Sequence, residues 1–416
     1  MRHLFIACLL VAGSTLAHGQ DILIRGATVH TVTDRGTLQN ADVLIRNGRI
    51  QAVGAGLSGG EGTTTIDAQG RALTPGMFAG LTGIGVEEIS AEATTQDRAV
   101  MPNAPPFEME WRPEFDVTRA YDPRSTLVPV TRIEGMTWTV LAPASAEGGS
   151  FLAGQGAAVT LDGGYEAMLE GSRALFVYLG GQMNALSQGS RAAQWMLLEQ
   201  AIGEARRGVA GPDALLHPLG REALASYLKG GRVVFHVSRA SDILRTVAFA
   251  KQHGMKPVIA GGEEAWVVAD ELAREDVPVL LDTLANLPVS FDQIAARMDN
   301  AALLERAGVR IAFTQFGESH NARKIRQLAG NAVAHGLAKD AALAALTATP
   351  AAIFGLGERR GRIASGQVAD LVLWSGDPLE VTSVADQVWI AGRAMPMRSR
   401  QTELRDRYLE RLRSNP

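Results

Sequence analysis

The middle of the chain alternates short, continuous apolar runs with amphipathic stretches, and this alternation constrains the fold more than any other feature. The apolar runs are residues 138–142, 174–178, 233–237, 257–260, 277–281 and 309–313. Continuous apolar runs are typical of strands buried on both faces, as in parallel sheets. Amphipathic stretches between them, such as 241–253 and 262–275, predict helices. The alternation predicts an α/β fold, a (β/α)8 TIM barrel, over residues 76–358.

Both ends of the chain have the pattern of short strands separated by glycine turns. Residues 21–30, 41–45 and 49–53 are β-rich, and Asn47-Gly48 between two of these runs is a strong hairpin signal. Residues 361–394 return to the same pattern. We therefore predict a small β-sandwich formed by both termini, from residues 20–75 and 359–398. Charged residues with apolar residues at helical spacing predict a terminal helix over 399–416.

Residues 1–19 have the features of a secretory signal peptide. A short basic start with Arg2 precedes an apolar run, residues 4–12, that is too short to cross a bilayer. Ala17-His18-Gly19 fits a cleavage site before Gln20. The alternative is a buried first helix, but a run directly behind Arg2 favours the signal peptide. We therefore expect a periplasmic or secreted protein with no membrane attachment after cleavage.

Charge and cysteine content exclude several function classes. The formal net charge of −4 is small and has the wrong sign for a nucleic-acid partner. The single cysteine, Cys8, lies in the signal peptide, so the mature chain has no disulfide, thiolate ligand or cysteine nucleophile. A chain of 416 residues can bury a core large enough to fold without a metal.

Several segments carry a family resemblance that covers nearly the whole mature chain. They are ILIRGATVHT, DVLIRNGRI, IDAQGRALTPG, HNAR at 320–323 with LTATPAAIFGL after it, and GRIASGQVADLVLWSGDPL. Together they resemble the amidohydrolase superfamily, and most closely its secreted, imidazolonepropionase-like branch. The resemblance implies a (β/α)8 barrel with a small β-sandwich from both termini, in agreement with the strand pattern. It also implies a hydrolase that acts on carbon–nitrogen bonds.

The resemblance further implies one or two divalent metals at the C-terminal mouth of the barrel. Such a metal lowers the pKa of a bound water and polarises the scissile carbonyl. The family ligands are a His-x-His after the first strand, a Lys or Glu after the fourth, and a His after each of the fifth and sixth. An aspartate after the eighth strand completes the set and takes the proton of the water.

Most of these ligand positions hold residues that bind metals poorly. The degenerate positions are Leu81 and Gly83 for His-x-His, Phe176 or a close neighbour for the Lys or Glu, Gly261 for the sixth-strand histidine, and Gln315 for the aspartate. Only His236 stands at an expected ligand position. The histidines outside the signal peptide form no H-x-H, H-x-x-H or H-x-x-x-H spacing. We therefore expect no cofactor, and a divalent metal such as zinc only in an active hydrolase.

His236 and Gln315 are the remaining catalytic candidates. His236 could act as a general base or bind a substrate group, although a lone strand-end histidine is more often satisfied by neighbouring backbone. Gln315 could orient an amide or a water but cannot accept a proton. Glu87-Glu88 could face the mouth, although loop glutamates are mostly solvated. Glu263-Glu264 fit the first turn of a helix, where acidic residues favour the dipole.

Two further segments allow more than one interpretation. Residues 95–125 form a long, Pro-rich insertion that could be a lid or a partner surface, with Phe107, Trp111 and Phe115 as anchors. The glycine-rich residues 148–156 resemble a loop of the secreted branch but lack the Lys-Ser/Thr of a phosphate loop. A flexible loop is the simpler interpretation there.

The sequence leaves two functions open, because fold alone does not fix function. Lost ligands on a retained fold favour a weakly active or inactive homologue. Such a protein would act as a binding protein, or as a partner subunit in a homo- or hetero-oligomer with an intact amidohydrolase relative. The usual activity of the family favours an active hydrolase of dipeptide or non-peptide carbon–nitrogen bonds, with an atypical site around His236.

Overall fold

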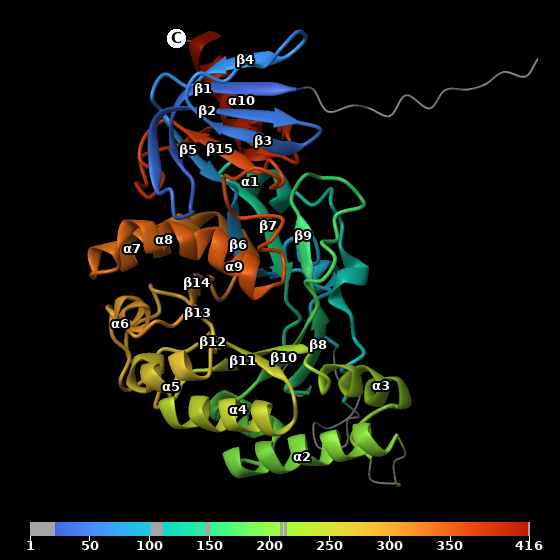
Figure 1. Cartoon of the computed structure of the whole chain (residues 1–416). Helices are drawn as coiled ribbons and strands as arrows, with labels where there is room; N and C mark the ends of the chain where they lie inside the picture. Colours follow the sequence, from blue (N-terminus) through green and yellow to red (C-terminus); the bar gives the residue numbers. More distant parts are fainter. Residues whose placement is uncertain (1–20, 101–110, 146–149, 209–210, 212–213, 415–416) are drawn as a thin grey trace, which may run out of the picture.

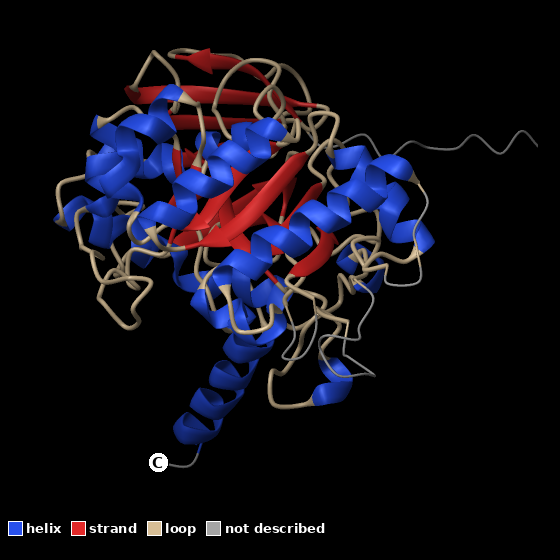
Figure 2. Cartoon of the chain, turned by 90° about the horizontal axis from the view of Figure 1, so that it is seen from below, coloured by secondary structure: helices blue, strands red, loops and turns tan. Residues whose placement is uncertain are grey.

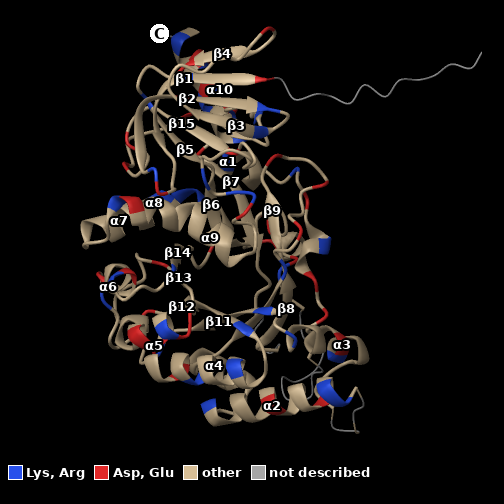
Figure 3. Ribbon diagram, viewed as in Figure 1, with Lys and Arg blue, Asp and Glu red and all other residues tan. Residues whose placement is uncertain are grey.

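The computed structural model describes residues 21–100, 111–145, 150–208, 211 and 214–414. The predicted signal peptide, Phe107 and Gly148-Gly149 lie outside the described residues. Of the helices in these ranges, none combines the length and the apolar character that a membrane crossing requires. Acidic and basic residues are interspersed along the helices and loops (Figure 3).

One sheet, here called the terminal sheet, gathers strands from both ends of the chain (Figure 1). Its strand order is β17-β16-β15-β5-β1-β2-β3, with β4 beside β1. The strands are β1 (Ile22–His30), β2 (Thr37–Arg46), β3 (Arg49–Gly54), β4 (Thr64–Asp67), β5 (Ala72–Pro75), β15 (Leu371–Trp374), β16 (Ala385–Ile390) and β17 (Arg393–Ala394). Asn47 and Gly48 have φ values of 48° and 73° and form the predicted turn between β2 and β3. The antiparallel pairing of β5 with β15 joins the two ends of the chain.

The other strands form a ring with eight positions within the described residues. We call each position a stave, and β8 and β9 together occupy the third. In order they are β6 (Met77–Thr82), β7 (Met136–Leu141), β8 with β9 (Leu152–Gly156 and Ala158–Thr160), β10 (Ala174–Tyr178), β11 (Arg232–Val237), β12 (Lys256–Gly261), β13 (Val279–Leu281) and β14 (Ile311–Phe313). β9 pairs with β7 and β8 pairs with β10, so one stretch of chain links two sheets. The Leu81 amide donates to Thr314 Oγ1 at 2.9 Å, which closes the ring between β6 and the end of β14.

This ring is the predicted barrel with one departure, because the third stave runs antiparallel to both neighbours. A parallel return needs a crossover of about a dozen residues or more, and residues 142–151 are too few. The chain also packs tightly here, since a Cβ on Gly156 would lie 1.9 Å from the Leu141 carbonyl oxygen. The glycine-rich segment from Gly154 to Gly156 is therefore a close-packed strand, and its interpretation as a flexible loop is wrong.

Helices surround the barrel strands (Figure 2). They are α1 (Leu127–Arg132), α2 (Arg191–Arg207), α3 (Pro218–Tyr227), α4 (Ala240–Gln252), α5 (Ala269–Arg274), α6 (Asn300–Arg306), α7 (Ile325–Ala334), α8 (Lys339–Leu346) and α9 (Ala348–Ile353). The barrel interior is a single apolar cluster that includes Phe78, Phe176 and Val234. The predicted terminal helix is α10 (Arg400–Ser414), which has no buried residue and projects from the body (Figure 2).

The insertion after the first strand contributes to the core. Trp111 is only 3% exposed and packs edge-on against Phe151, with ring centroids 4.5 Å apart. The Phe115 carbonyl accepts a hydrogen bond from the Gln155 amide at 2.7 Å, and its side chain packs on a small buried cluster. The predicted role of Trp111 as a partner anchor is therefore wrong, because the indole is buried within the chain itself.

Candidate functional site at the barrel mouth

A cavity of about 390 Å³ opens at the C-terminal ends of the barrel strands. This is the face on which (β/α)8 proteins carry their active sites. The strand-end residues in its wall include Leu81, Tyr178, His236, Gly261 and Gln315. Four of the six residues at the family ligand positions therefore share one cavity. Phe176 is fully buried in the barrel interior, and neither it nor Gly83 lines the cavity.

His236 is held in the cavity wall by aromatic contacts. Its ring stacks on Tyr178 at 4.1 Å between centroids, and Phe316 meets it edge-on at 5.4 Å. The Tyr178 hydroxyl donates to the Pro143 carbonyl at 2.8 Å, which fixes the stack. His236 Nε2 is buried and has no hydrogen-bond partner among the described residues. The interpretation of His236 as satisfied by neighbouring backbone is therefore wrong for this nitrogen.

The surroundings keep His236 uncharged at neutral pH. Burial lowers the pKa of His236 to about 3, and the nearby positive charge of Arg98 acts in the same direction. A base with so low a pKa is a poor proton acceptor at neutral pH, because general-base catalysis is most effective when the pKa lies near the working pH.

Arg98 is the site residue that the sequence did not reveal. It comes from the insertion after the first strand and lies directly on Gly83, where a Cβ would be 2.3 Å from Arg98 Cδ. Its Nη1 atom donates to Glu87 Oε2 at 3.0 Å, and the Ser319 hydroxyl donates to the same oxygen at 3.2 Å. The Gly83 amide donates in turn to Ser319 Oγ at 3.0 Å. We call Arg98, Glu87, Ser319 and Gly83 the mouth cluster.

The mouth cluster corrects the expectation for Glu87, which is 7% exposed rather than solvated. Glu88 is also bonded, since it accepts hydrogen bonds from the Ser125 hydroxyl and from the Thr126 amide. The one sequence feature that could have pointed to Arg98 is Gly83. A glycine in place of a larger side chain leaves a space, and close packing requires another group to fill it.

Two buried carboxylates, Glu263 and Glu264, follow β12, and Glu263 lines the cavity. Glu264 accepts hydrogen bonds from the Ala240 amide at 3.0 Å and from the Ala295 amide at 2.9 Å. It therefore binds the start of the neighbouring helix α4, and although it stands at the N-cap of the turn that follows β12, it makes no cap hydrogen bond there. Glu263 lines the cavity, its Oε2 is buried without a partner, and burial raises its pKa.

Gln315 lies in the cavity wall but is partly engaged. Its Nε2 donates to the Phe316 carbonyl at 2.7 Å. The amide remains able to orient a ligand but not to take up a proton.

The residues at the mouth do not fit the divalent metal that the family chemistry implies. No group of three or more His, Cys, Asp or Glu side chains able to hold a metal ion occurs in the described ranges. Leu81 presents an apolar group, and Arg98 carries a positive charge over Gly83, which stands at a family ligand position. Both make the approach of a cation costly. That the protein lacks a cofactor stays a prediction.

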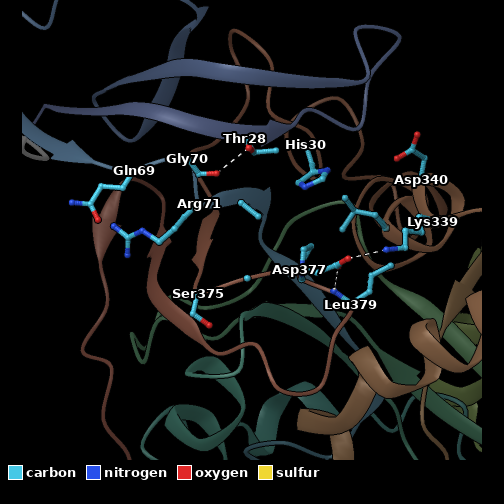
Figure 4. A pocket seen from close by; sticks show the side chains of 14 residues that line it. Thr28, His30, Gln69, Gly70, Arg71, Lys339, Asp340, Ser375, Asp377 and Leu379 are labelled. Carbon is cyan, nitrogen blue, oxygen red and sulfur yellow. Dashed lines mark hydrogen bonds and ion pairs between the residues drawn. The ribbon is translucent and has the colours of Figure 1, made fainter.

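A second cavity, of about 480 Å³, lies between the terminal sheet and α8 (Figure 4). Three of the charged side chains that line it are paired: Lys339 with Asp377 at 2.9 Å, and Arg71 with Asp386 at 2.7 Å. His30 bonds to the Thr37 hydroxyl at 3.0 Å. The mouth cavity, which holds unpartnered polar atoms, is therefore the better candidate for a functional site.

Comparisons with known proteins agree with this architecture. Residues 216–395 match the model of the amidohydrolase family. The structure is similar to the crystal structure of an amidohydrolase from Thermotoga maritima, with 24% identity over 91% of this chain and 100% of that one and a TM-score of 0.78. The family match thus covers the C-terminal part of this chain, and the structural likeness shows that the fold is shared over nearly its whole length.

Two other proteins extend the comparison. An adenosine deaminase from Xanthomonas campestris, solved with bound zinc, has 16% identity over 95% of this chain and 99% of its own, with a TM-score of 0.53. That likeness shows the fold alone. Amidohydrolase tasK from Hapsidospora irregularis is 43% identical over 74 residues, which are 18% of this chain and 8% of that protein. The match thus spans a small part of that relative.

The ion pair between Arg98 and Glu87 gives a first prediction. Because Glu87 is nearly buried, Arg98→Met leaves its carboxylate without a charged partner, and we expect a loss of stability. In a double-mutant cycle with Glu87→Gln, a coupling energy of about 1–2 kcal/mol is expected from chemical denaturation. Arg119→Met is the control, since Arg119 is largely exposed and lies 3.9 Å from Asp116. A coupling near zero would contradict the proposed pair.

The pKa of His236 gives a second prediction. The folded-state pKa of about 3 lies below the ordinary value of 6.5, so the unfolded chain binds more protons between these values. Stability therefore falls as the pH decreases through this range. In His236→Gln this contribution is absent, so the stability of the wild type relative to the variant should decrease between about pH 7 and pH 4. Urea unfolding at each pH measures this difference in stability. Parallel plots of stability against pH for the two proteins would refute the prediction.

Proposed function

We propose that this amidohydrolase homologue binds a small polar molecule at the barrel mouth without a metal and has little or no hydrolase activity. The observation that carries the proposal is the mouth cluster. It places a fixed guanidinium over Gly83, at a position that holds a metal ligand in the family pattern. A guanidinium offers hydrogen bonds to a ligand, but it cannot generate a hydroxide nucleophile from water as a divalent metal does.

The other cavity residues also favour binding over hydrolysis. His236 is a weak base because burial lowers its pKa to about 3. Gln315 replaces the proton-accepting aspartate with an amide. A cavity of about 390 Å³ lined by both polar and apolar side chains has the size of a small-molecule site. The signal-peptide features support the further proposal that the protein works in the periplasm or outside the cell.

The alternative function is an active hydrolase with an atypical site. One observation favours it: Glu263 is a cavity carboxyl whose pKa is raised by burial, which is typical of acid–base residues in active sites. Glu263 would have to act without a metal and opposite a histidine that stays neutral.

The third prediction separates these functions. We expect purified mature protein to contain far less than one equivalent of zinc, manganese or iron by elemental analysis. Chelator treatment should not change its melting temperature, because no metal contributes to folding. Turnover of dipeptides and cyclic amides should remain at background with or without added zinc. Stoichiometric metal together with chelator-sensitive turnover would exclude the proposal, and metal-free turnover abolished by Glu263→Gln would establish the alternative.

An exposed apolar segment after β13 supports an additional role as a partner subunit. It presents large apolar side chains to solvent: Leu284, Leu287, Val289, Phe291 and Ile294, which are 52%, 60%, 80%, 89% and 63% exposed. The segment is anchored from inside, since Asp292 accepts the Gly181 amide at 2.6 Å. Ser290, Asp292 and Gln293 of the same segment line the cavity. Contiguous exposed apolar surface marks interaction sites.

The fourth prediction tests this role. We propose that a second copy of the chain or an intact amidohydrolase relative covers the segment. The double variant Val289→Ser and Phe291→Ser should shift the protein towards a monomer in light scattering coupled to size exclusion, measured alone and after co-expression with such a relative. Tyr165→Ser is the matched control, because Tyr165 is 77% exposed and lies outside the segment. A wild-type protein that is monomeric in both settings would contradict the role.

A further inference from the structure

We infer that the mouth cavity receives a small amino carboxylate, with its carboxylate on Arg98 and its ammonium group near Glu263. The inference rests on the proposed function, since it names the ligand class of the same site. It depends on three features of the cavity: a partly exposed guanidinium, an unpartnered carboxylate oxygen on the other side, and apolar side chains in the wall.

Arg98 has an unused hydrogen-bonding edge. Glu87 binds the Nη1 atom, which lies on the side of the guanidinium that faces Cδ. Nη2 has no partner among the described residues and is not buried, whereas Nε is buried against Gly83. The Arg98 side chain is 22% exposed and lines the cavity, so the Nη2 end of the guanidinium is open to a ligand. A charged N–H donor of this kind suits the oxygen of a carboxylate.

The opposite wall carries hydrogen-bond acceptors. Glu263 follows β12 and Arg98 follows β6, and these strands stand three places apart in the ring of eight, nearly across the mouth. Glu263 Oε2 and Gln293 Oε1 are both buried without partners among the described residues. Leaving such acceptors unpaired costs free energy. An ammonium group would supply both a positive charge and the missing donors.

Apolar side chains also line the cavity, beside polar ones such as Gln182 and Asp292. Leu81, Met183 and Phe316 contribute with the stacked rings of Tyr178 and His236. These apolar surfaces suit the hydrocarbon part of a ligand. The ligand therefore carries both charges and an apolar part.

Four six-carbon probes test this assignment by isothermal titration calorimetry: 2-aminohexanoate, 6-aminohexanoate, hexanoate and hexylamine. They share a carbon chain and differ only in their charged groups. We expect one of the two amino acids to bind at least about tenfold more tightly than both hexanoate and hexylamine, because only an amino acid engages both walls. The isomer that binds more tightly indicates how far apart the two charged sites lie.

Conservative variants assign each end of the ligand. Arg98→Lys keeps the charge that Glu87 needs but removes the Nη2 donor, so the preference of the site for amino acid over hexylamine should be lost. Glu263→Gln should remove the preference over hexanoate. Arg119→Lys, on an exposed surface, should change neither preference. Unchanged melting temperatures establish that each variant is folded.

The outcomes separate this inference from the proposed function. If folded, metal-free protein binds none of the four probes, or binds hexanoate as tightly as the amino acids, the ligand class is wrong while the metal-free function stands. If the preferences persist in both Arg98→Lys and Glu263→Gln, the two ends are wrongly assigned. Stoichiometric metal with chelator-sensitive turnover overturns the proposed function itself.

Discussion

The ion pair between Arg98 and Glu87 is the interaction on which the barrel mouth depends. It joins the loop after β6 to the insertion, and through Ser319 it reaches the segment after β14. It exists because Gly83 has no side chain, since a Cβ there would collide with Arg98 Cδ. A glycine at one position and an arginine fifteen residues later thus form one structural unit. That unit sets the charge of the cavity.

Burial explains the state of the other residues at the mouth. Burial, aided by the positive charge of Arg98, keeps His236 neutral, and burial raises the pKa of Glu263. Unpartnered polar atoms of Arg98, His236, Glu263 and Gln293 lie around a cavity lined by both polar and apolar side chains. Buried polar groups are usually paired, and groups left open in a cavity are typical of a site that awaits a ligand. These residues support binding, whereas metal-assisted hydrolysis would need a different set of donors.

The scaffold under the mouth differs from a regular barrel in one stave. β8 and β9 run antiparallel to their neighbours because the connection from β7 is too short for a helical crossover. The stave packs against β7 so closely that Gly156 cannot carry a side chain. Phe115, from the insertion that also carries Arg98, bonds to this stave through Gln155. The insertion is therefore anchored to the barrel on one side and supplies the guanidinium to the mouth on the other.

The sequence by itself determined the elements of this protein. Continuous apolar runs predicted β10 and β11, the Asn47-Gly48 turn predicted a hairpin, and missing histidines at Leu81 and Gly83 predicted a poor metal site. These features are local, since they depend on side-chain periodicity, turn conformation or residue identity. Only the tertiary structure decided that Trp111 is buried, that the third stave is antiparallel, and that Arg98 stands over Gly83. Each of those outcomes depends on contacts between residues that are distant in the chain. Neither residue spacing nor composition shows which side chain will fill the space beside a small residue such as Gly83.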